Sequence, residues 1–239
     1  MIEWSRLTNH EVDALDRRLP VLIPLGLIEA HGPHLSLSVD IDTAEFFSRE
    51  IAKSTGAILA PGLPYGFADE MRDYPGTLGL TIGTFTTVIA ELGVSFCRHG
   101  FDRLIFLSGH GANKSPCESA FWTIWDTFPD ARLACWNWWS EAGISGIHHA
   151  DKGETEVAAV AGAVYHPERA VDYKIDKPWY KLRSRFAIHP QSGGINGEPT
   201  KANLDNGKTN RDKVVQVLSD KVAEIMRADG IDPASRQVE

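Results

Sequence analysis

The sequence contains the stretch Pro24-Leu-Gly-Leu-Ile-Glu29-Ala-His31-Gly-Pro-His34-Leu-Ser-Leu-Ser-Val-Asp40-Ile-Asp42, in which histidines and acids follow an apolar run. The apolar residues Val21–Leu25 predict a short buried strand that ends before the Gly-Pro pair. Glu29 and His31 are two residues apart, so in extended backbone their side chains point to the same side. The intervening loop can fold Asp40 back over that side. Two carboxylates and an imidazole at a strand end are ligands for a hard or borderline divalent metal ion.

Each of these residues also has an ordinary structural explanation. Glu29 can face solvent, His31 can be a turn histidine bonded to the backbone, and Asp40 can cap a helix. A metal site is the better explanation because all three lie beside one buried strand. His34 is assigned no role. Asp42 begins the capping-box pattern Asp-Thr-Ala-Glu, so we expect it to cap a helix from 42 to about 53 rather than bind metal.

Length and composition favour one globular α/β domain over residues 1–239, since 43% of the residues are hydrophobic. The formal net charge of −8 argues against nucleic acid or an anionic membrane as a partner. No apolar stretch approaches the ~18 residues of a membrane span, and the N-terminus does not resemble a secretory signal. Cys97, Cys117 and Cys135 form no C-x-x-C pair and are typical of a reducing compartment, so we expect a cytoplasmic protein.

Strands and helices are predicted to alternate along the chain. We expect strands at 21–25, 57–60, 103–108 and 131–136, with a further short strand after Tyr74. We expect helices at 8–17, 42–53, 84–98, 113–128, 149–164 and 207–227. Residues 172–197 show no periodicity and predict a long excursion near the site or at a subunit contact. The alternation predicts a mostly parallel sheet.

The clearest buried strand, Arg103–Ser108, is followed at once by Gly109-His110-Gly111 and a helix. This order places His110 at the carboxyl edge of a parallel sheet, where ligands of open α/β sheets bind. The two glycines let the backbone approach a bound group closely. A turn histidine bonded to the backbone is the structural alternative for His110.

Two further regions are candidates for substrate contact. Trp136, Trp138 and Trp139 follow a strand and form either core or an apolar wall over a pocket. We favour the wall, with Trp138 and Trp139 against the substrate. The Pro/Gly-dense loop 61–73 is long for a compact domain, and such loops are often functional, so Tyr65 is a further candidate.

The stretch from Glu29 to Asp40 resembles the signature E-x-H-G-P-H-L-P-L-x-x-D of the creatininase (creatinine amidohydrolase) family, with Ser36 in place of a proline. The resemblance covers residues 5 to 225 approximately. Further family motifs follow in the family's order: Tyr74-Pro-Gly-Thr77, Ser108-Gly-His110-Gly-Ala-Asn113, His149-Ala-Asp-Lys-Gly-Glu154-Thr and Gly194-Ile-Asn-Gly-Glu-Pro199. The resemblance implies a three-layer α/β/α fold, a small-molecule substrate and a homo-oligomer. Members of the family are often hexamers.

The resemblance also implies two divalent metal ions per subunit (zinc, manganese or iron) bridged by an aspartate. Carried over by motif, one metal would be bound by Glu29, Asp40 and His110, and the other by His31 with Asp40. His149 would be the catalytic proton carrier. Glu154 would complete the second metal's ligands or orient the attacking water, although an acid in a first helical turn also interacts favourably with the helix dipole.

Departures from the family pattern bear on the substrate. Creatininase carries tyrosine and glutamate where this chain has Gly111 and Ala112, and a tryptophan where it has Ser145, which argues against creatinine. We expect Gly111 to border the substrate. The Gly-His-Gly-Ala-Asn form is similar to formamidopyrimidine deformylase, the mycofactocin-system peptidase and hydrolases of cyclic keto-sugars. We therefore predict a metal-dependent hydrolase of a small cyclic or formyl amide, with C–C hydrolysis of a cyclic β-dicarbonyl sugar or a non-catalytic metal-binding role as alternatives.

Overall fold

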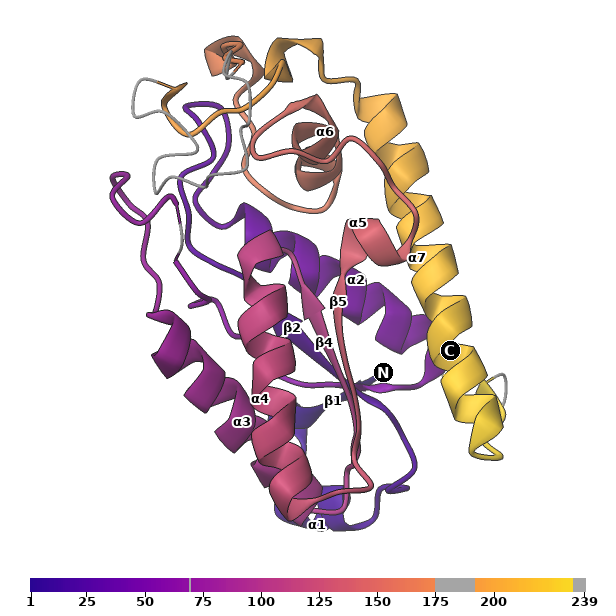
Figure 1. Cartoon of the computed structure of the whole chain (residues 1–239). Coiled ribbons are helices and arrows are strands. Elements are labelled where there is room, and N and C mark those ends of the chain that lie inside the picture. Colours follow the sequence, from indigo (N-terminus) through magenta and orange to yellow (C-terminus); the bar gives the residue numbers. More distant parts are fainter. Residues whose placement is uncertain (69, 175–191, 234–239) are drawn as a thin grey trace.

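The computed structural model describes residues 1–68, 70–174 and 192–233 of the chain. Its strands form a parallel sheet in the order β1-β3-β2-β4-β5 (Figure 1). The strands are β1 Ile2–Glu3, β2 Val21–Leu25, β3 Ile58–Leu59, β4 Arg103–Ser108 and β5 Arg132–Asn137. Among these strands only β1 is not predicted from the sequence, because two residues are too few to form a pattern.

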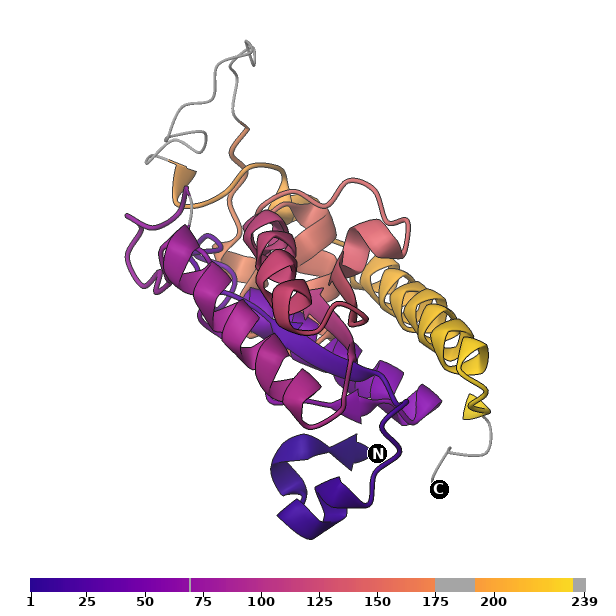
Figure 2. The ribbon, with the colours of Figure 1, turned by 60° about the horizontal axis from the view of Figure 1, so that its bottom comes forward.

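Helices cover both faces of the sheet (Figure 1). α3 and α4 pack against each other on one face, and α2 and α7 pack against each other on the other. The helices are α1 Asn9–Asp13, α2 Val39–Thr55, α3 Ile82–Arg98, α4 Lys114–Thr127, α5 Trp138–Glu141, α6 Lys152–Val160 and α7 Leu204–Ala228. In Figure 2 α7 (yellow) runs along one side of the molecule, far from α3. The predicted α/β fold with a parallel sheet is confirmed.

The strand order reverses at β2, because β3 lies on one side of it and β4 on the other. The helices that make these two connections, α2 and α3, lie on opposite faces of the sheet. Such a reversal opens a crevice at the carboxyl ends of the two strands involved. Here those ends are Leu25 of β2 and Ser108 of β4, which are register partners, and Ser108 is opposite Asn137 of β5. The segments that follow β2, β4 and β5 therefore leave the sheet side by side at the same edge.

The core supports this edge from below. β2 is buried along its whole length, as expected of a strand covered by helices on both faces. Phe106 of β4, Phe47 of α2 and Phe85 of α3 are fully buried and belong to one apolar cluster. Both helical layers thus contribute aromatic side chains to the core, which holds the strand ends rigidly beneath the loops that follow them.

The capping box predicted at Asp42 is wrong, because α2 begins three residues earlier, at Val39. Asp42 instead lies in the first turn and accepts a hydrogen bond from Ser38 Oγ at 2.6 Å. Tertiary packing fixes this start: Gly26 lies against the backbone of Ile41, where a Cβ on Gly26 would come within 2.5 Å. Asp40 is consequently helical and buried rather than part of a loop.

Two other local predictions are wrong. The helix predicted from 84 begins at Ile82, because its cap is Thr81, which accepts a hydrogen bond from the Thr84 N–H at 3.3 Å. The described residues between Tyr74 and α3 form no strand, and isolated bridges pair Leu78 with Ile28 and Leu80 with Phe67. These residues pack over the loop after β2 instead of extending the sheet.

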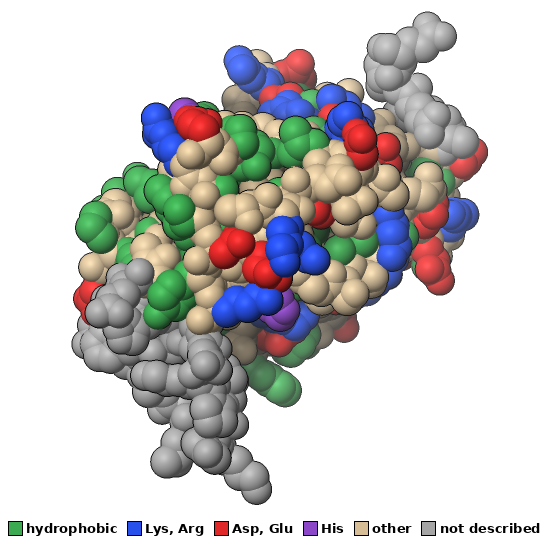
Figure 3. All heavy atoms as spheres, turned by 90° about the horizontal axis from the view of Figure 1, so that it is seen from above, with side chains coloured by type: hydrophobic (Ala, Val, Ile, Leu, Met, Phe, Trp, Pro, Cys, Tyr) green, Lys and Arg blue, Asp and Glu red, His purple; other side chains and the backbone are tan. Residues whose placement is uncertain are grey.

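Most of the excursion predicted at 172–197 lies outside the described residues. Seen from the side that carries α6, the surface shows acidic and basic side chains next to one another, so neither sign dominates this face (Figure 3). No helix within the described part of the chain is both long enough and apolar enough to span a bilayer.

Candidate metal centre

The loop after β2 carries Glu29 and His31 and is held in place by hydrogen bonds on both sides. The Glu29 N–H donates to the Leu37 carbonyl at 2.8 Å, and the Ala30 N–H donates to Thr77 Oγ1 at 3.1 Å. Glu29 and His31 are each only 1% exposed. Two ionisable side chains are thus fixed in a buried position by their own loop.

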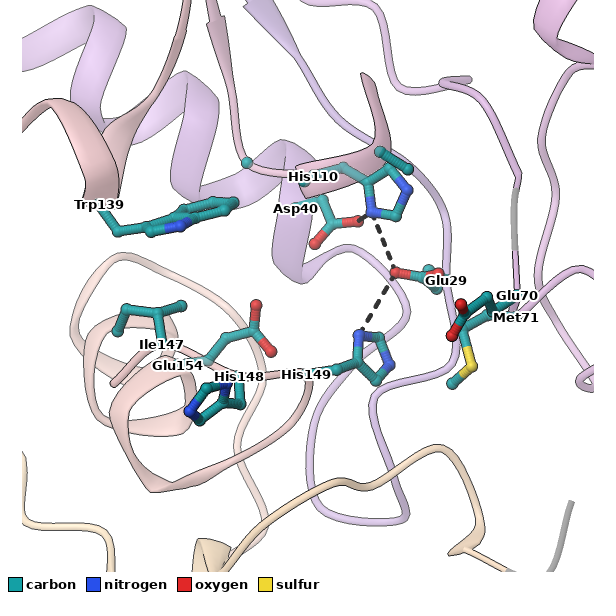
Figure 4. A pocket seen from close by; sticks show the side chains of 13 residues that line it. Glu29, Asp40, Glu70, Met71, His110, Trp139, Ile147, His148, His149 and Glu154 are labelled. Atoms are coloured by element: carbon teal, nitrogen blue, oxygen red, sulfur yellow. Dashed lines mark ion pairs between the residues drawn. The ribbon is translucent and has the colours of Figure 1, made fainter. Parts of the chain in front are cut away.

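Asp40 and His110 reach the same point from two other elements (Figure 4). The turn after β4 packs directly on the start of α2, because a Cβ on Gly109 would lie 2.0 Å from the Asp40 carbonyl oxygen. This approach brings His110 Nδ1 within 3.2 Å of Asp40 Oδ2 and 3.3 Å of Glu29 Oε2. The glycine before His110 is therefore required for the geometry of the site.

His31 and Glu154 form a second group at the other oxygen of Asp40. His31 Nε2 lies 3.3 Å from Asp40 Oδ1 and 3.6 Å from Glu154 Oε2. The Glu29 carbonyl oxygen, which can only accept, lies 3.1 Å from His31 Nδ1, so Nδ1 carries a proton and Nε2 is the ring nitrogen that faces the carboxylates. Metal-binding histidines are commonly oriented in this way. Asp40 directs one oxygen to each group, as a bridging carboxylate would.

The donor set fits divalent metal ions. Within the described residues, both carboxylate oxygens of Glu29, His31 Nε2 and Asp40 Oδ2 are buried without a hydrogen-bond partner. Leaving such an atom unsatisfied costs about 1–3 kcal/mol, so the arrangement is explained if a cation satisfies it. The ligand atoms of Glu29, Asp40 and His110 lie within 4.8 Å of one another, as do those of His31, Asp40 and Glu154. Mixed oxygen and nitrogen ligands suit zinc, manganese or iron.

Burial and neighbouring charges shift the pKa values of these groups in opposite directions. Burial alone would raise the pKa of Glu29, but the neighbouring histidines, His110 above all, together outweigh it, and the pKa is lowered. Burial alone would lower the pKa of His31, but the Asp40 carboxylate above all raises it to about 10. Imidazole protons thus supply the positive charge that the carboxylates require when no metal is bound, and a metal ion would displace them.

His149 and Glu154 come from the segment that leads into α6. A carbonyl oxygen, that of Ala30, lies 2.8 Å from His149 Nε2, so Nε2 donates and Nδ1 faces Glu29 Oε2 at 3.7 Å (Figure 4). The His149 side chain is 17% exposed and can be reached from the cavity. Glu154 Oε2 accepts the Ala150 N–H at 2.5 Å, and burial raises the pKa of Glu154.

A cavity of about 260 Å³ opens over these groups. One wall is formed by Gly111, Ala112 and Trp139. A Cβ on Gly111 would make only an ordinary contact, at 3.8 Å from Trp139 Cζ2, so this wall has unused space. The small residues at 111 and 112 therefore leave room beside the Trp139 ring.

Trp138 and Tyr65, both predicted to contact substrate, lie elsewhere. Trp138 is 1% exposed and packs in the core, with its ring centroid 5.3 Å from that of Phe47. Successive helical residues point about 100° apart, so Trp138 faces the core while the next residue, Trp139, faces the cavity. Tyr65 is 47% exposed and does not line the cavity.

The sequence predicts no direct role for four residues that line the cavity: Glu70, Met71, Ile147 and His148. The first two lie in the Pro/Gly-dense loop, whose composition indicated function without indicating which side chain points inward. The other two directly precede His149, and this position in the sequence was the only indication that they lie near the site. Figure 4 shows Glu70 and Met71 beside Glu29, on the opposite side of the site from Trp139.

Comparison with known proteins identifies the family. The family model described as Creatininase: Creatinine amidohydrolase matches residues 5–222. The creatinine amidohydrolase of Pseudomonas putida is 31% identical over 99 residues, which cover 39% of this chain and 38% of that protein. The mycofactocin precursor peptide peptidase of Mycobacterium ulcerans is 33% identical over 146 residues, which cover 57% and 56%. The chain thus spans about half or less of the length of these curated relatives.

A solved structure supports the fold. A mutant creatininase described as the Zn-Zn type superposes with a TM-score of 0.82 at 22% identity, over 93% of this chain and 97% of that one. At this identity the likeness establishes the architecture rather than the activity. The match of the family model over residues 5–222 shows that this chain belongs to the creatininase family.

Proposed function

We propose that this chain is a dinuclear metal-dependent hydrolase that cleaves the C–N bond of a small cyclic or formyl amide. The observation that carries the proposal is Asp40, whose two oxygens face separate groups of ligand atoms. Glu29 and His110 complete one group, and His31 and Glu154 complete the other. Ala112 stands where creatininase has a glutamate ligand, and Glu154 offers the missing carboxylate from α6.

Two divalent ions at these groups would supply a water molecule of lowered pKa and a polarised carbonyl oxygen. The residues of the chain define where the reaction takes place. Glu29 and Asp40 are carboxylates held by buried backbone, so their positions change little when a substrate enters. The open side of the site, toward the cavity of about 260 Å³, is where the scissile amide would lie.

His149 would move the proton that the reaction requires. Its Nε2–H is tied to the Ala30 carbonyl, so the proton lost by the attacking water is taken up at Nδ1. When the C–N bond breaks, the leaving nitrogen takes that proton from Nδ1, and the imidazole returns to its starting form. Imidazole suits this cycle because its ordinary pKa is close to neutral pH. A protein that only bound metal would not need such a group.

The size of the cavity supports a small substrate. About 260 Å³ is at or below the lower end of ligand pockets, roughly 300–1,000 Å³. Gly111 and Ala112 add no bulky side chain to the cavity wall beside Trp139, which suits a small amide better than a large one. Relatives named as a creatinine amidohydrolase and a precursor peptide peptidase both act on amide-type bonds.

The test is a substrate panel with zinc- or manganese-loaded protein. The panel contains small lactams, aryl and alkyl formamides, short peptides and cyclic β-dicarbonyl sugars. We expect turnover of a lactam or a formamide, abolished by chelator and restored by metal. His149→Gln is the matched control, because it removes the proton carrier without removing a proposed ligand.

Each other outcome of the panel has a definite meaning. Turnover confined to β-dicarbonyl sugars would replace the amide by C–C hydrolysis, with His149 protonating carbon. Turnover confined to peptides would enlarge the substrate class beyond small amides. Fully loaded protein that turns over no member of the panel would contradict the proposed activity and favour a non-catalytic metal-binding role.

A further inference from the structure

The backbone directly after His149 is strained. Ala150 has φ of 51°, and it is the only non-glycine with positive φ in the part of the chain that the structure describes. This left-handed conformation is unfavourable for a residue with a Cβ and persists only where surrounding contacts impose it. Something must therefore hold the loop His149–Asp151 in place.

Two hydrogen bonds donated by backbone N–H groups of a distant segment hold this loop. The Asn196 N–H donates to the His149 carbonyl at 3.0 Å, and the Glu198 N–H donates to Asp151 Oδ1 at 2.6 Å. Asp151 is the N-cap residue of α6, yet its side chain makes no capping hydrogen bond to that helix. Its carboxylate is used to bind the distant segment instead.

The same segment, Gly194–Glu198, is shaped to fit against the loops of the site. A Cβ on Gly197 would lie 2.1 Å from Asp151 Oδ1, so this position has no room for a side chain. Gly194 has φ of 84°, and a Cβ there would lie 3.1 Å from the Ala30 carbonyl oxygen, the acceptor for His149 Nε2. Ile195 between them is fully buried. The segment therefore contacts both the backbone of His149 and the carbonyl that orients its ring.

We propose that Asp151 and the segment Gly194–Glu198, here called the clamp, position the imidazole of His149. The clamp keeps the strained loop in one conformation, so that Nε2–H stays on the Ala30 carbonyl and Nδ1 stays on the side of Glu29 and the cavity. Asp151 is thus a positioning residue that acts through His149. The clamp rests on the proposed function only in taking His149 as the proton carrier.

The test compares Asp151→Ala with Asp151→Asn and with Asp172→Ala. An asparagine Oδ1 can still accept the Glu198 N–H, so Asp151→Asn is the conservative variant. Asp172 accepts the Thr200 N–H at 3.1 Å without touching the His149 loop, so its loss is a matched control. The readout is the ¹⁵N spectrum of histidine-labelled, zinc-loaded protein, with the His149 signals assigned from their absence in His149→Gln.

We expect the Nε2–H tautomer pattern of His149 in wild type, Asp151→Asn and Asp172→Ala, and its loss in Asp151→Ala with metal content unchanged. Turnover of Asp151→Ala should fall about 10- to 100-fold with KM unchanged, the usual effect of losing a residue that orients a catalytic group. A wild-type pattern in Asp151→Ala, or equal loss in Asp151→Asn, would overturn the clamp. If the patterns behave as expected but wild type turns over no substrate, the proposed function fails and the clamp stands.

Discussion

At the amino ends of β4 and β5, Arg103 and Arg132 lie opposite each other in the ladder, and Asp229 accepts hydrogen bonds from both. At the carboxyl ends of the same strands, the chain continues into His110 and α5. There carboxylates and imidazoles face one another, and four of their buried atoms within the described residues have no hydrogen-bond partner: Glu29 Oε1, Glu29 Oε2, His31 Nε2 and Asp40 Oδ2.

The two ends differ in how their charges are satisfied. At one end the charged groups pair with each other and stabilise the fold, whereas at the other they form a site that a ligand can complete. At the amino end each arginine meets a carboxylate, and those hydrogen bonds lower the pKa of Asp229. At the carboxyl end Glu29 and Asp40 are both acids in one buried space, where they repel each other. A folded protein keeps such an arrangement at a functional site and stabilises it elsewhere. The following predictions test this contrast, from the largest expected effect to the smallest.

Replacing the proton carrier should have the largest effect. We expect His149→Gln to lower kcat about 10²- to 10⁴-fold, the usual contribution of general acid–base catalysis, and to leave metal content unchanged. The measurement is steady-state kinetics on the amide found in the panel, with metal analysis of the same sample. Loss of metal together with activity would show that His149 is a ligand instead.

The ionisable groups at the carboxyl ends of the strands should make the stability of metal-free protein depend on pH. The folded pKa of His31, about 10, lies above the ordinary 6.5, so its contribution is complete below about pH 6.5 and is lost as pH rises through about 10. The pKa of Glu29 is lowered from 4.5, so its contribution is present above that pH and is lost as pH falls. Urea unfolding with chelator should therefore show falling stability from pH 6.5 to 10.

Zinc should reverse this dependence, because metal displaces the histidine protons and binds more tightly as pH rises. His31→Gln should remove much of the slope in metal-free protein, and replacing the exposed His10 by glutamine should not. A flat stability profile for metal-free wild type over this range would contradict the assignment of the charges at the carboxyl end.

Two glycines that flank His110 should respond differently to the same substitution. Gly109→Ala places a Cβ 2.0 Å from the Asp40 carbonyl oxygen, whereas Gly111→Ala meets Trp139 only at 3.8 Å. We expect Gly109→Ala to lower the free energy of unfolding by about 1–3 kcal/mol and to reduce metal content. Gly111→Ala should change stability by less than about 0.5 kcal/mol and alter only substrate preference. Equal loss of metal in both variants would refute the packing argument.

Changes to the ion pairs at the amino ends of β4 and β5 should affect stability alone. Asp229→Ala leaves Arg103 and Arg132 without their shared carboxylate, and we expect a loss of about 1–3 kcal/mol in the free energy of unfolding. Metal content and turnover should not change. Asp212→Ala is the control, since it removes an exposed pair with Arg211 of a kind that contributes about 0–1 kcal/mol. A change in the metal content of Asp229→Ala would show that the two ends of the strands are coupled, which would contradict this prediction.

Much of the centre could be predicted from the sequence, because its ligands follow strand ends at short, fixed spacings. Glu29, His31 and Asp40 lie within one stretch, and His110 follows the clearest buried strand. Parallel strands end at one edge, so periodicity and turn residues were sufficient to bring these four side chains together. The start of α2 was misplaced because a local capping pattern cannot report that Gly26 packs on its first turn.

The contacts that could not be predicted are those between segments far apart in the chain. The bond from Glu198 to Asp151 and the left-handed Ala150 depend on tertiary packing and leave no local pattern. Trp138 and Trp139 are identical in type, and only the start of α5 decides which one faces the cavity. Residue types thus indicated which side chains gather at the site, whereas their positions required the fold.

The most direct test of the central claim is metal content per subunit, measured by elemental analysis on protein purified without chelator. The dinuclear account predicts about two equivalents in wild type, loss of both in Asp40→Ala, and loss of about one in Glu154→Ala. One equivalent or none in wild type, or a content unchanged by Asp40→Ala, would contradict Asp40 as the bridging ligand.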